Sequence, residues 1–138
     1  GLKEGMIYQN PNGEEFVMIR GEGYPVLRIG ERYDRELSNE AFEIPKRREN
    51  TNHVFHQYVL RTKRRDELIR YLDEKEIGTI IHYPIPPHLA QAYEYLGFRK
   101  GDFPVAERFA DEVLSIPMYN GMTQEEQTYV IEALNAFK

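Results

Sequence analysis

The chain has 138 residues, a length that suits one domain with a hydrophobic core and is short for a complete cofactor-dependent enzyme. Its net charge of −5 gives no reason to expect nucleic acid or an anionic membrane as a partner, and no apolar run approaches the ~20 residues of a membrane span. The lack of cysteine excludes disulfides, thiolate catalysis and cysteine-based zinc sites, and it is compatible with a cytoplasmic location.

Residues 1–27 are expected to form an amino-terminal extension built on a β-hairpin. The pair Asn12-Gly13 supplies the positive φ angles that a tight hairpin turn needs. The segments Ile7–Gln9 and Glu15–Ile19 flank this turn, so they are predicted to be the paired strands. The origin of this extension cannot be read from its sequence.

A second region, residues 28–138, begins within a helix predicted over Val26–Leu37. Apolar side chains recur there at helical spacing, at Ile29, Tyr33 and Leu37, and form the expected buried face. The polar stretch Ser38–Asn52 that follows reads as a connecting loop.

From His53 onward, short strands and helices follow one another closely. A strand over Val54–Arg61 would alternate its side chains, with Val54 and His56 on one face and Phe55 on the other. The further predicted elements are a helix over Asp66–Glu76, a strand over Thr79–Tyr83, a helix over His88–Leu96 capped by Gly97, a helix opening at Pro104, a strand over Leu114–Pro117, and a last helix behind the capping box Thr123-x-x-Glu126. The order predicts an α+β fold with a small, mainly antiparallel sheet covered by helices.

The three carboxy-terminal helices have apolar side chains that are expected to face the core. These are Leu89, Ala92, Tyr93 and Leu96 in the first, Ala106, Phe109, Ala110 and Val113 in the second, and Val130, Ala133, Leu134 and Phe137 in the third.

The stretch Gly78–His88 is the best candidate for a functional segment. Its prolines, Pro84, Pro86 and Pro87, are expected to stop the preceding strand and to hold the following loop extended. His82 and Tyr83 then sit at the end of a strand, a common place for functional side chains. They point to opposite faces, so at most one of them lines a cleft.

Six ordered motifs resemble the carboxy-terminal domain of the DegT/DnrJ/EryC1/StrS sugar aminotransferases, from about Arg28 to Lys138. They are His53-Val-Phe-His-Gln-Tyr-Val-Leu60, Arg65-Asp-Glu-Leu68, Gly78-Thr-Ile-Ile-His-Tyr-Pro84 with His88, Gly101-Asp-Phe-Pro-Val-Ala-Glu107, Leu114-Ser-Ile-Pro-Met-Tyr119 and Thr123-Gln-Glu-Glu126. The resemblance implies the small domain of an enzyme that uses pyridoxal phosphate and glutamate to convert a nucleotide-linked keto-sugar to an amino-sugar.

In that family the Schiff-base lysine, the acid on the pyridinium nitrogen and the phosphate cup lie in a large domain that is absent from this sequence. The resemblance therefore implies no catalytic and no cofactor-binding residue here, and no activity for this chain alone. Its own lysines all fall in polar stretches, unlike a desolvated Schiff-base lysine: Lys3, Lys46, Lys63, Lys75, Lys100 and Lys138. The implied partners are a nucleotide-sugar and either the missing large domain or further copies of the chain.

The resemblance places His82 and Tyr83 near the substrate sugar, with His88 just beyond, so these three are the predicted substrate-binding residues. Two alternatives stay open. One is a non-catalytic module derived from this domain that binds a sugar-nucleotide or a protein. The other is a small unrelated enzyme that uses His82 and Tyr83 as acid and base.

No metal site is expected, because His53 and His56 would point to opposite faces of a strand, and His56 is expected to be a core histidine. The basic groups Lys46–Arg48 and Arg61–Arg65 could meet a diphosphate, although solvated surface charge is the favoured interpretation. An apolar surface that packs on the large domain should be exposed here, which predicts self-association unless residues 1–27 cover it.

Overall fold

The computed structural model describes residues 7–9, 15–17, 25–51 and 53–138. The amino-terminal hairpin is confirmed in its pairing, since β1 (Ile7–Gln9) runs antiparallel to β2 (Glu15–Val17) with Tyr8 opposite Phe16. The predicted turn, and the last two residues of the longer second strand that the sequence predicts, lie outside the described residues.

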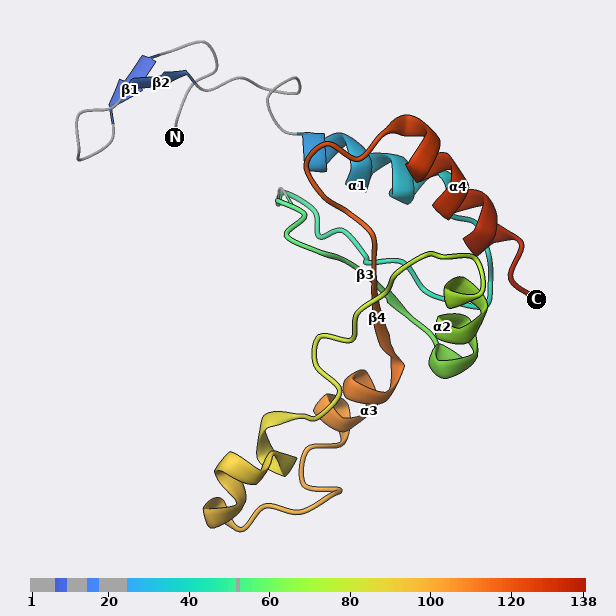
Figure 1. Ribbon diagram of the computed structural model, residues 1–138. Coiled ribbons are helices and arrows are strands. Elements are labelled where there is room, and N and C mark those ends of the chain that lie inside the picture. Colours follow the sequence, from blue (N-terminus) through green and yellow to red (C-terminus); the bar gives the residue numbers. More distant parts are fainter. Residues whose placement is uncertain (1–6, 10–14, 18–24, 52) are drawn as a thin grey trace.

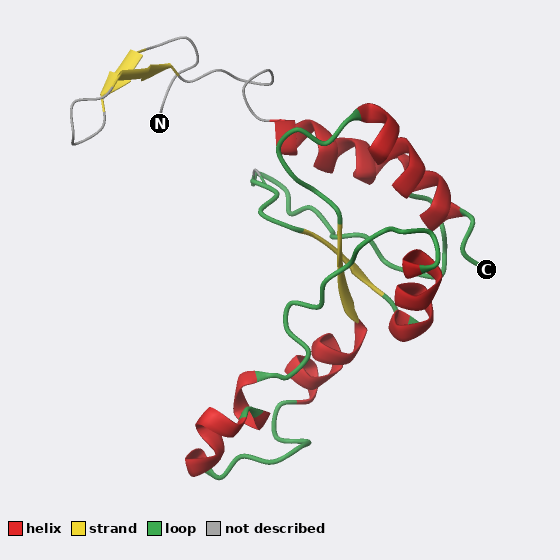
Figure 2. Cartoon of the chain, viewed as in Figure 1, coloured by secondary structure: helices red, strands yellow, loops and turns green. Residues whose placement is uncertain are grey.

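The remaining elements form an α+β domain with a small antiparallel sheet, as predicted (Figures 1 and 2). In chain order they are α1 (Pro25–Glu36), β3 (Tyr58–Arg61), α2 (Arg65–Asp73), η1 (Pro87–Leu89), η2 (Gln91–Leu96), α3 (Pro104–Glu112), β4 (Val113–Ile116) and α4 (Gln124–Asn135). In the sheet, Tyr58 pairs with Ile116 and Arg61 with Val113. Single antiparallel bridges extend it at both edges, Glu43 to Arg61 and Ile80 to Ser115.

The core lies between this sheet and the helices α1, α2 and α4 (Figure 1). Its fully buried large side chains come from all of these elements: Tyr33, Tyr58, Leu60, Leu68, Leu72, Leu114 and Leu134. The two buried phenols keep their hydrogen bonds, since Tyr33 donates to the Pro117 carbonyl at 2.7 Å and Tyr58 to the Asp34 carboxylate at 2.7 Å. The expected faces of α1 and α4 are confirmed as buried.

The strand predicted over Val54–Arg61 is shorter in the structure and begins at Tyr58. Phe55 has a φ of 50°, in the left-handed region, which breaks the alternation of side chains before the strand begins. Phe55 is therefore buried and Val54 is 75% exposed. His56 is also exposed, so the prediction of a core histidine is wrong.

The strand predicted over Thr79–Tyr83 is reduced to one bridge, in which Ile80 exchanges both backbone hydrogen bonds with Ser115. The helix before it ends at Asp73 and not at Glu76, because Glu76 adopts a φ of 58° and Ile77 N–H returns to the Leu72 carbonyl. The strand predicted over Leu114–Pro117 runs one residue earlier, over Val113–Ile116.

Residues 83–109, called the arm below, extend away from the sheet and carry η1, η2 and most of α3 (Figure 1). The helix predicted over His88–Leu96 is wrong in type: two 3-10 helices replace it, separated by Ala90 in an extended conformation. Gly97 does cap the second with a φ of 73°, and α3 does open at Pro104.

The inner faces predicted for the arm are largely wrong. Ala92, Tyr93, Leu96, Ala106 and Phe109 are exposed and Leu89 is half-buried, while Ala110 and Val113, beyond the arm, are buried. The arm thus shows to solvent the apolar side chains that the sequence pattern assigns to a core.

The described helices include none that is long and apolar enough to cross a membrane.

Candidate functional site

Two of the three predicted site residues line cavities, and the two cavities are separate. His82 lines a cavity of about 180 Å³ at the edge of the sheet, called the His82 cavity. Its polar wall consists of His56, Gln57, Thr79, His82 and Ser115. His88 lies in the wall of a second, apolar cavity of about 380 Å³ in the arm, called the arm cup. Tyr83 lines neither of them.

A hydrogen bond from the sheet holds His82 in its cavity. Its Nδ1 lies 2.9 Å from the Ser115 hydroxyl oxygen, and Ser115 is a buried residue of β4. The Ile80 bridge to the same Ser115 fixes the backbone two residues before His82. Since Nδ1 takes this bond, Nε2 is the ring nitrogen that can meet a sugar hydroxyl or a phosphate oxygen.

Tyr83 turns away from the His82 cavity. Its side chain is 73% exposed, and its ring stands perpendicular to the His82 ring with 5.6 Å between the centroids. The expectation that only one of the two neighbours lines a cleft agrees with this geometry. An acid and base pair made of His82 and Tyr83 would need both in the same cavity, and the structure does not bring them together there.

His88 is held by Glu107 from α3. Its Nε2 lies 2.9 Å from Glu107 Oε1, and both side chains are nearly buried. Glu107 also accepts backbone hydrogen bonds from Gly101 at 2.8 Å and Phe103 at 3.3 Å. Burial pushes the pKa of this carboxyl up, but the hydrogen bonds from Gly101, His88 and Phe103 outweigh it and lower the pKa below its ordinary value. The pair ties η1 to the start of α3.

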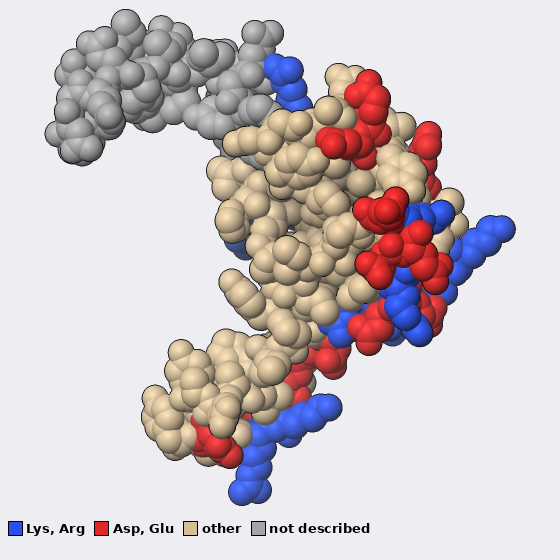
Figure 3. Space-filling model, in the orientation of Figure 1, with Lys and Arg blue, Asp and Glu red and all other residues tan. Residues whose placement is uncertain are grey.

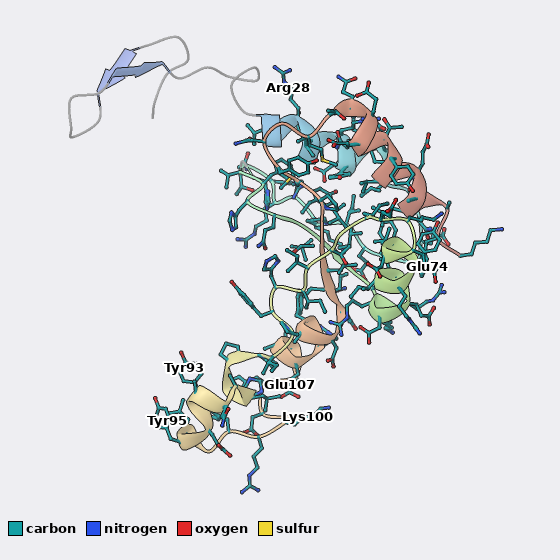
Figure 4. The ribbon with its side chains drawn as sticks, in the orientation of Figure 1. Arg28, Glu74, Tyr93, Tyr95, Lys100 and Glu107 are labelled. Carbon is teal, nitrogen blue, oxygen red and sulfur yellow. The ribbon has the colours of Figure 1, made fainter. Side chains whose placement is uncertain are left out.

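The arm cup is built from apolar side chains on three consecutive parts of the arm. Its lining includes Pro87, Tyr93, Leu96, Phe98, Phe103 and Ala106. Figure 4 shows Tyr95 pointing away from the arm. An apolar surface of this kind suits a hydrophobic group of a ligand or of a partner.

The described lysines do not fit a pyridoxal phosphate site. A Schiff-base lysine needs a desolvated position that lowers its pKa. Lys46, Lys63, Lys100 and Lys138 are exposed, and the half-buried Lys75 places its ammonium 5.0 Å from the centre of the Tyr71 ring. Lys3 lies outside the described residues.

Four arginines of the two basic groups are paired with acids on the surface. Arg47 binds Asp34 through two nitrogens, at 2.7 and 2.9 Å, and covers the Phe55 ring. Arg61 binds Glu43 at 2.6 Å, and Arg64 and Arg65 pair with Glu67 and Asp66. These ion pairs favour the interpretation of the basic groups as ordinary surface charge. The four paired arginines do not form a cluster that is available to bind a diphosphate.

His53 and His56 have different surroundings in the structure. His53 accepts a hydrogen bond from the Phe55 N–H at 3.0 Å, and His56 lines the His82 cavity. Among the described residues, no group of three or more histidine or acidic side chains is placed to hold a metal ion.

Two residues that shape the site, Ser115 and Glu107, were not among the predicted ones. Ser115 and His82 are 33 positions apart in the chain, and the pairing of Ile80 with β4 brings them together. Glu107 lies 19 positions from His88. Such long-range contacts cannot be predicted from local periodicity. Both residues nevertheless lie in motifs that resemble the aminotransferase family, Leu114–Tyr119 and Gly101–Glu107.

Comparison with known proteins identifies the family. The model of the DegT/DnrJ/EryC1/StrS aminotransferase family matches residues 27–135. A pleiotropic regulatory protein of Geobacillus stearothermophilus is 43% identical over 102 residues, 74% of this chain and 27% of its own length. The dTDP-3-amino-3,6-dideoxy-alpha-D-galactopyranose transaminase of Aneurinibacillus thermoaerophilus is 37% identical over 105 residues, 76% of this chain and 28% of its own.

Solved structures give the same answer. The crystal structure of DesV from S. venezuelae in complex with a ketimine intermediate superposes with a TM-score of 0.77 at 34% identity. The match covers 80% of this chain and 30% of DesV. The chain therefore spans less than a third of the length of these relatives and corresponds to their carboxy-terminal domain.

Proposed function

Since the chain belongs to the DegT/DnrJ/EryC1/StrS aminotransferase family, we propose that it forms the sugar-side half of the active site of a nucleotide-sugar aminotransferase. The enzyme would convert a nucleotide-linked keto-sugar to an amino-sugar with glutamate as donor. Its pyridoxal phosphate would be bound by the part of the relatives that lies outside the match, because the described lysines here are solvated or lie over a ring. The chain by itself would then be inactive.

The size of the His82 cavity carries this proposal. Sites for small molecules and cofactors usually measure roughly 300 to 1,000 Å³, and the His82 cavity measures about 180 Å³. A nucleotide-sugar therefore needs further walls. This supports half of a site and disfavours the alternative of a module that binds sugar-nucleotides without a partner.

The proposed contacts follow from the geometry of each residue. His82 would bind a sugar hydroxyl or a phosphate oxygen through Nε2, with Ser115 fixing the ring at Nδ1. Tyr83 turns away from the cavity, so it would contact the substrate only where the cofactor-binding part of the enzyme extends the site. In His88 the Nε2 is engaged by Glu107, so only Nδ1 would be available to a substrate group.

The test uses a joined enzyme, in which the full 138-residue chain follows the part of the A. thermoaerophilus transaminase that precedes its matched region. We expect this protein to transaminate that enzyme's dTDP-linked keto-sugar with glutamate. The substitution His82→Ala should raise the KM for the dTDP-sugar about tenfold, the factor of one lost hydrogen bond worth about 1.4 kcal/mol. His53→Ala, a histidine outside the cavity, should leave it unchanged. An unaltered KM in His82→Ala would contradict the assignment.

Calorimetry on the isolated chain addresses the alternative. Clear binding of UDP- or dTDP-sugars by the chain alone would favour a non-catalytic module, and no detectable binding is the result that the half-site predicts.

A further inference from the structure

We propose that the arm is the docking surface for the cofactor-binding part of the enzyme, and that the arm cup receives an apolar side chain of that part. This inference rests on the proposed function. It adds which surface makes the contact and which residues hold that surface in shape.

The arm exposes apolar side chains at a density that a free surface rarely has. Of the thirteen exposed large hydrophobic residues among those described, nine belong to it: Tyr83, Ile85, Tyr93, Tyr95, Leu96, Phe98, Phe103, Val105 and Phe109. Pro86 is the one buried residue of the arm, and every residue from 87 to 109 is at least partly exposed, so the arm has almost no core of its own. So many exposed apolar side chains are expected where another protein surface covers them.

Polar contacts between its segments help to hold the arm in shape. Glu107 gathers His88 and the amides of Gly101 and Phe103, and Asp102 accepts from the Arg99 amide at 2.8 Å. The charged side chains of the arm gather along one edge and leave much of the visible face uncharged (Figure 3). A preformed apolar cup with its polar groups internally paired is suited to a hydrophobic anchor.

The occupant we assign is the cofactor-binding part and not a second copy, for two reasons. The match covers only 27% to 30% of the relatives, so most of each related enzyme is available to cover this surface. The arm also begins at Tyr83, directly beside the His82 cavity. A domain seated on the arm is placed to supply the missing walls of that cavity, and covering by another arm would leave the half-site open.

Hydroxyl-radical footprinting of tyrosines tests this directly. Tyr95 in the arm is 80% exposed, and Tyr129 in α4 is 51% exposed and serves as the internal control. In the joined enzyme we expect Tyr95 to be oxidised at least fivefold more slowly than in the isolated chain, with Tyr129 within twofold. A Tyr95 that stays equally reactive in a joined enzyme with transaminase activity would overturn the inference and leave the proposed function standing. Protection of Tyr95 in a joined enzyme without transaminase activity would support the docking surface and contradict the proposed function.

Matched variants of the joined enzyme address the cup itself. Leu96→Glu puts a charge into the cup, whereas Val54→Glu puts the same charge at an exposed apolar position outside the arm. We expect Leu96→Glu to abolish the protection of Tyr95 and Val54→Glu to preserve it. Equal effects of the two variants would contradict a specific role of the cup. Protection of Tyr95 in the isolated chain as its concentration rises, with no further protection on joining, would assign the surface to a second copy and overturn the inference.

Discussion

Gly30 shows how one residue without a side chain positions another. A Cβ at Gly30 would overlap the Phe55 ring, which packs against helix α1 there. Phe55 in turn stacks parallel to Tyr58, with ring centroids 6.3 Å apart, and is covered by Arg47. The left-handed backbone of Phe55 and the missing side chain of Gly30 therefore belong to one packing arrangement.

We predict that Gly30→Ala lowers the free energy of unfolding by about 1 to 3 kcal/mol, as expected for overpacking. Helix propensity alone would favour alanine by about 1 kcal/mol, so the sign of the change decides which effect dominates. Gly78→Ala is the matched control, because nothing lies within 4 Å of a Cβ there. Denaturant unfolding of both variants is the measurement, and a more stable Gly30→Ala would contradict the packing described.

Glu107 makes the arm sensitive to acid. Its pKa in the folded protein is lowered, so its contribution to stability is fully present above the ordinary glutamate pKa of about 4.3. That contribution is lost as the pH falls further, through the lower folded value. We predict that amide exchange protection at Gly101 and Phe103 declines over this acidic range.

The variant Glu107→Gln should remove that pH dependence, because its side chain does not titrate. Protection factors of the two amides, measured by NMR against intrinsic rates, give the answer. A decline of equal size in Glu107→Gln would show that another group is responsible.

At the scale of elements, the sequence predicts well the boundaries that local chemistry sets. The capping box of α4 is present, with Glu126 N–H bonded to the Thr123 hydroxyl at 3.1 Å and Thr123 N–H to the Glu126 carboxylate at 2.8 Å. Pro104 opens α3 and Gly97 closes η2 for equally local reasons. Such boundaries need no knowledge of the rest of the fold.

The elements that the sequence predicts wrongly depend on distant parts of the chain. Thr79–Tyr83 has the residues of a strand, but only Ile80 reaches β4. The segment His88–Leu96 has helical spacing, yet it is split at Ala90 and exposes the face that the pattern assigns to a core. Its periodicity fits the proposed docking surface, because a face that packs on another domain has the same pattern as one that packs on its own core.

Thr123 offers a quantitative check on the last helix. We predict that Thr123→Ala lowers the free energy of unfolding by about 1 kcal/mol, the usual contribution of such a cap. Thr123→Ser keeps the hydroxyl and should stay within about 0.5 kcal/mol of the parent protein. Thermal or denaturant unfolding measures both, and an equal loss in the two variants would show that the methyl group matters more than the hydrogen bond.

At the scale of the whole molecule, the family and the fold class can be predicted from the sequence, but only part of the site can. His82 lines a cavity at the edge of the sheet, and its contact with a substrate stays a prediction. Its partner Ser115 and the separation of His82 from the His88 and Glu107 pair follow from tertiary pairing that no local pattern encodes. The half-site and the docking surface proposed above both require a further domain to complete them.

The initial rate of transamination of a dTDP-linked keto-sugar with glutamate and pyridoxal phosphate is the most direct test of the proposed half-site. It is measured side by side for the 138-residue chain and for the joined enzyme. We expect turnover by the joined enzyme and none by the chain alone, which should also show no cofactor absorbance band that borohydride abolishes. Transamination by the isolated chain, or a folded and cofactor-loaded joined enzyme without turnover, would contradict it.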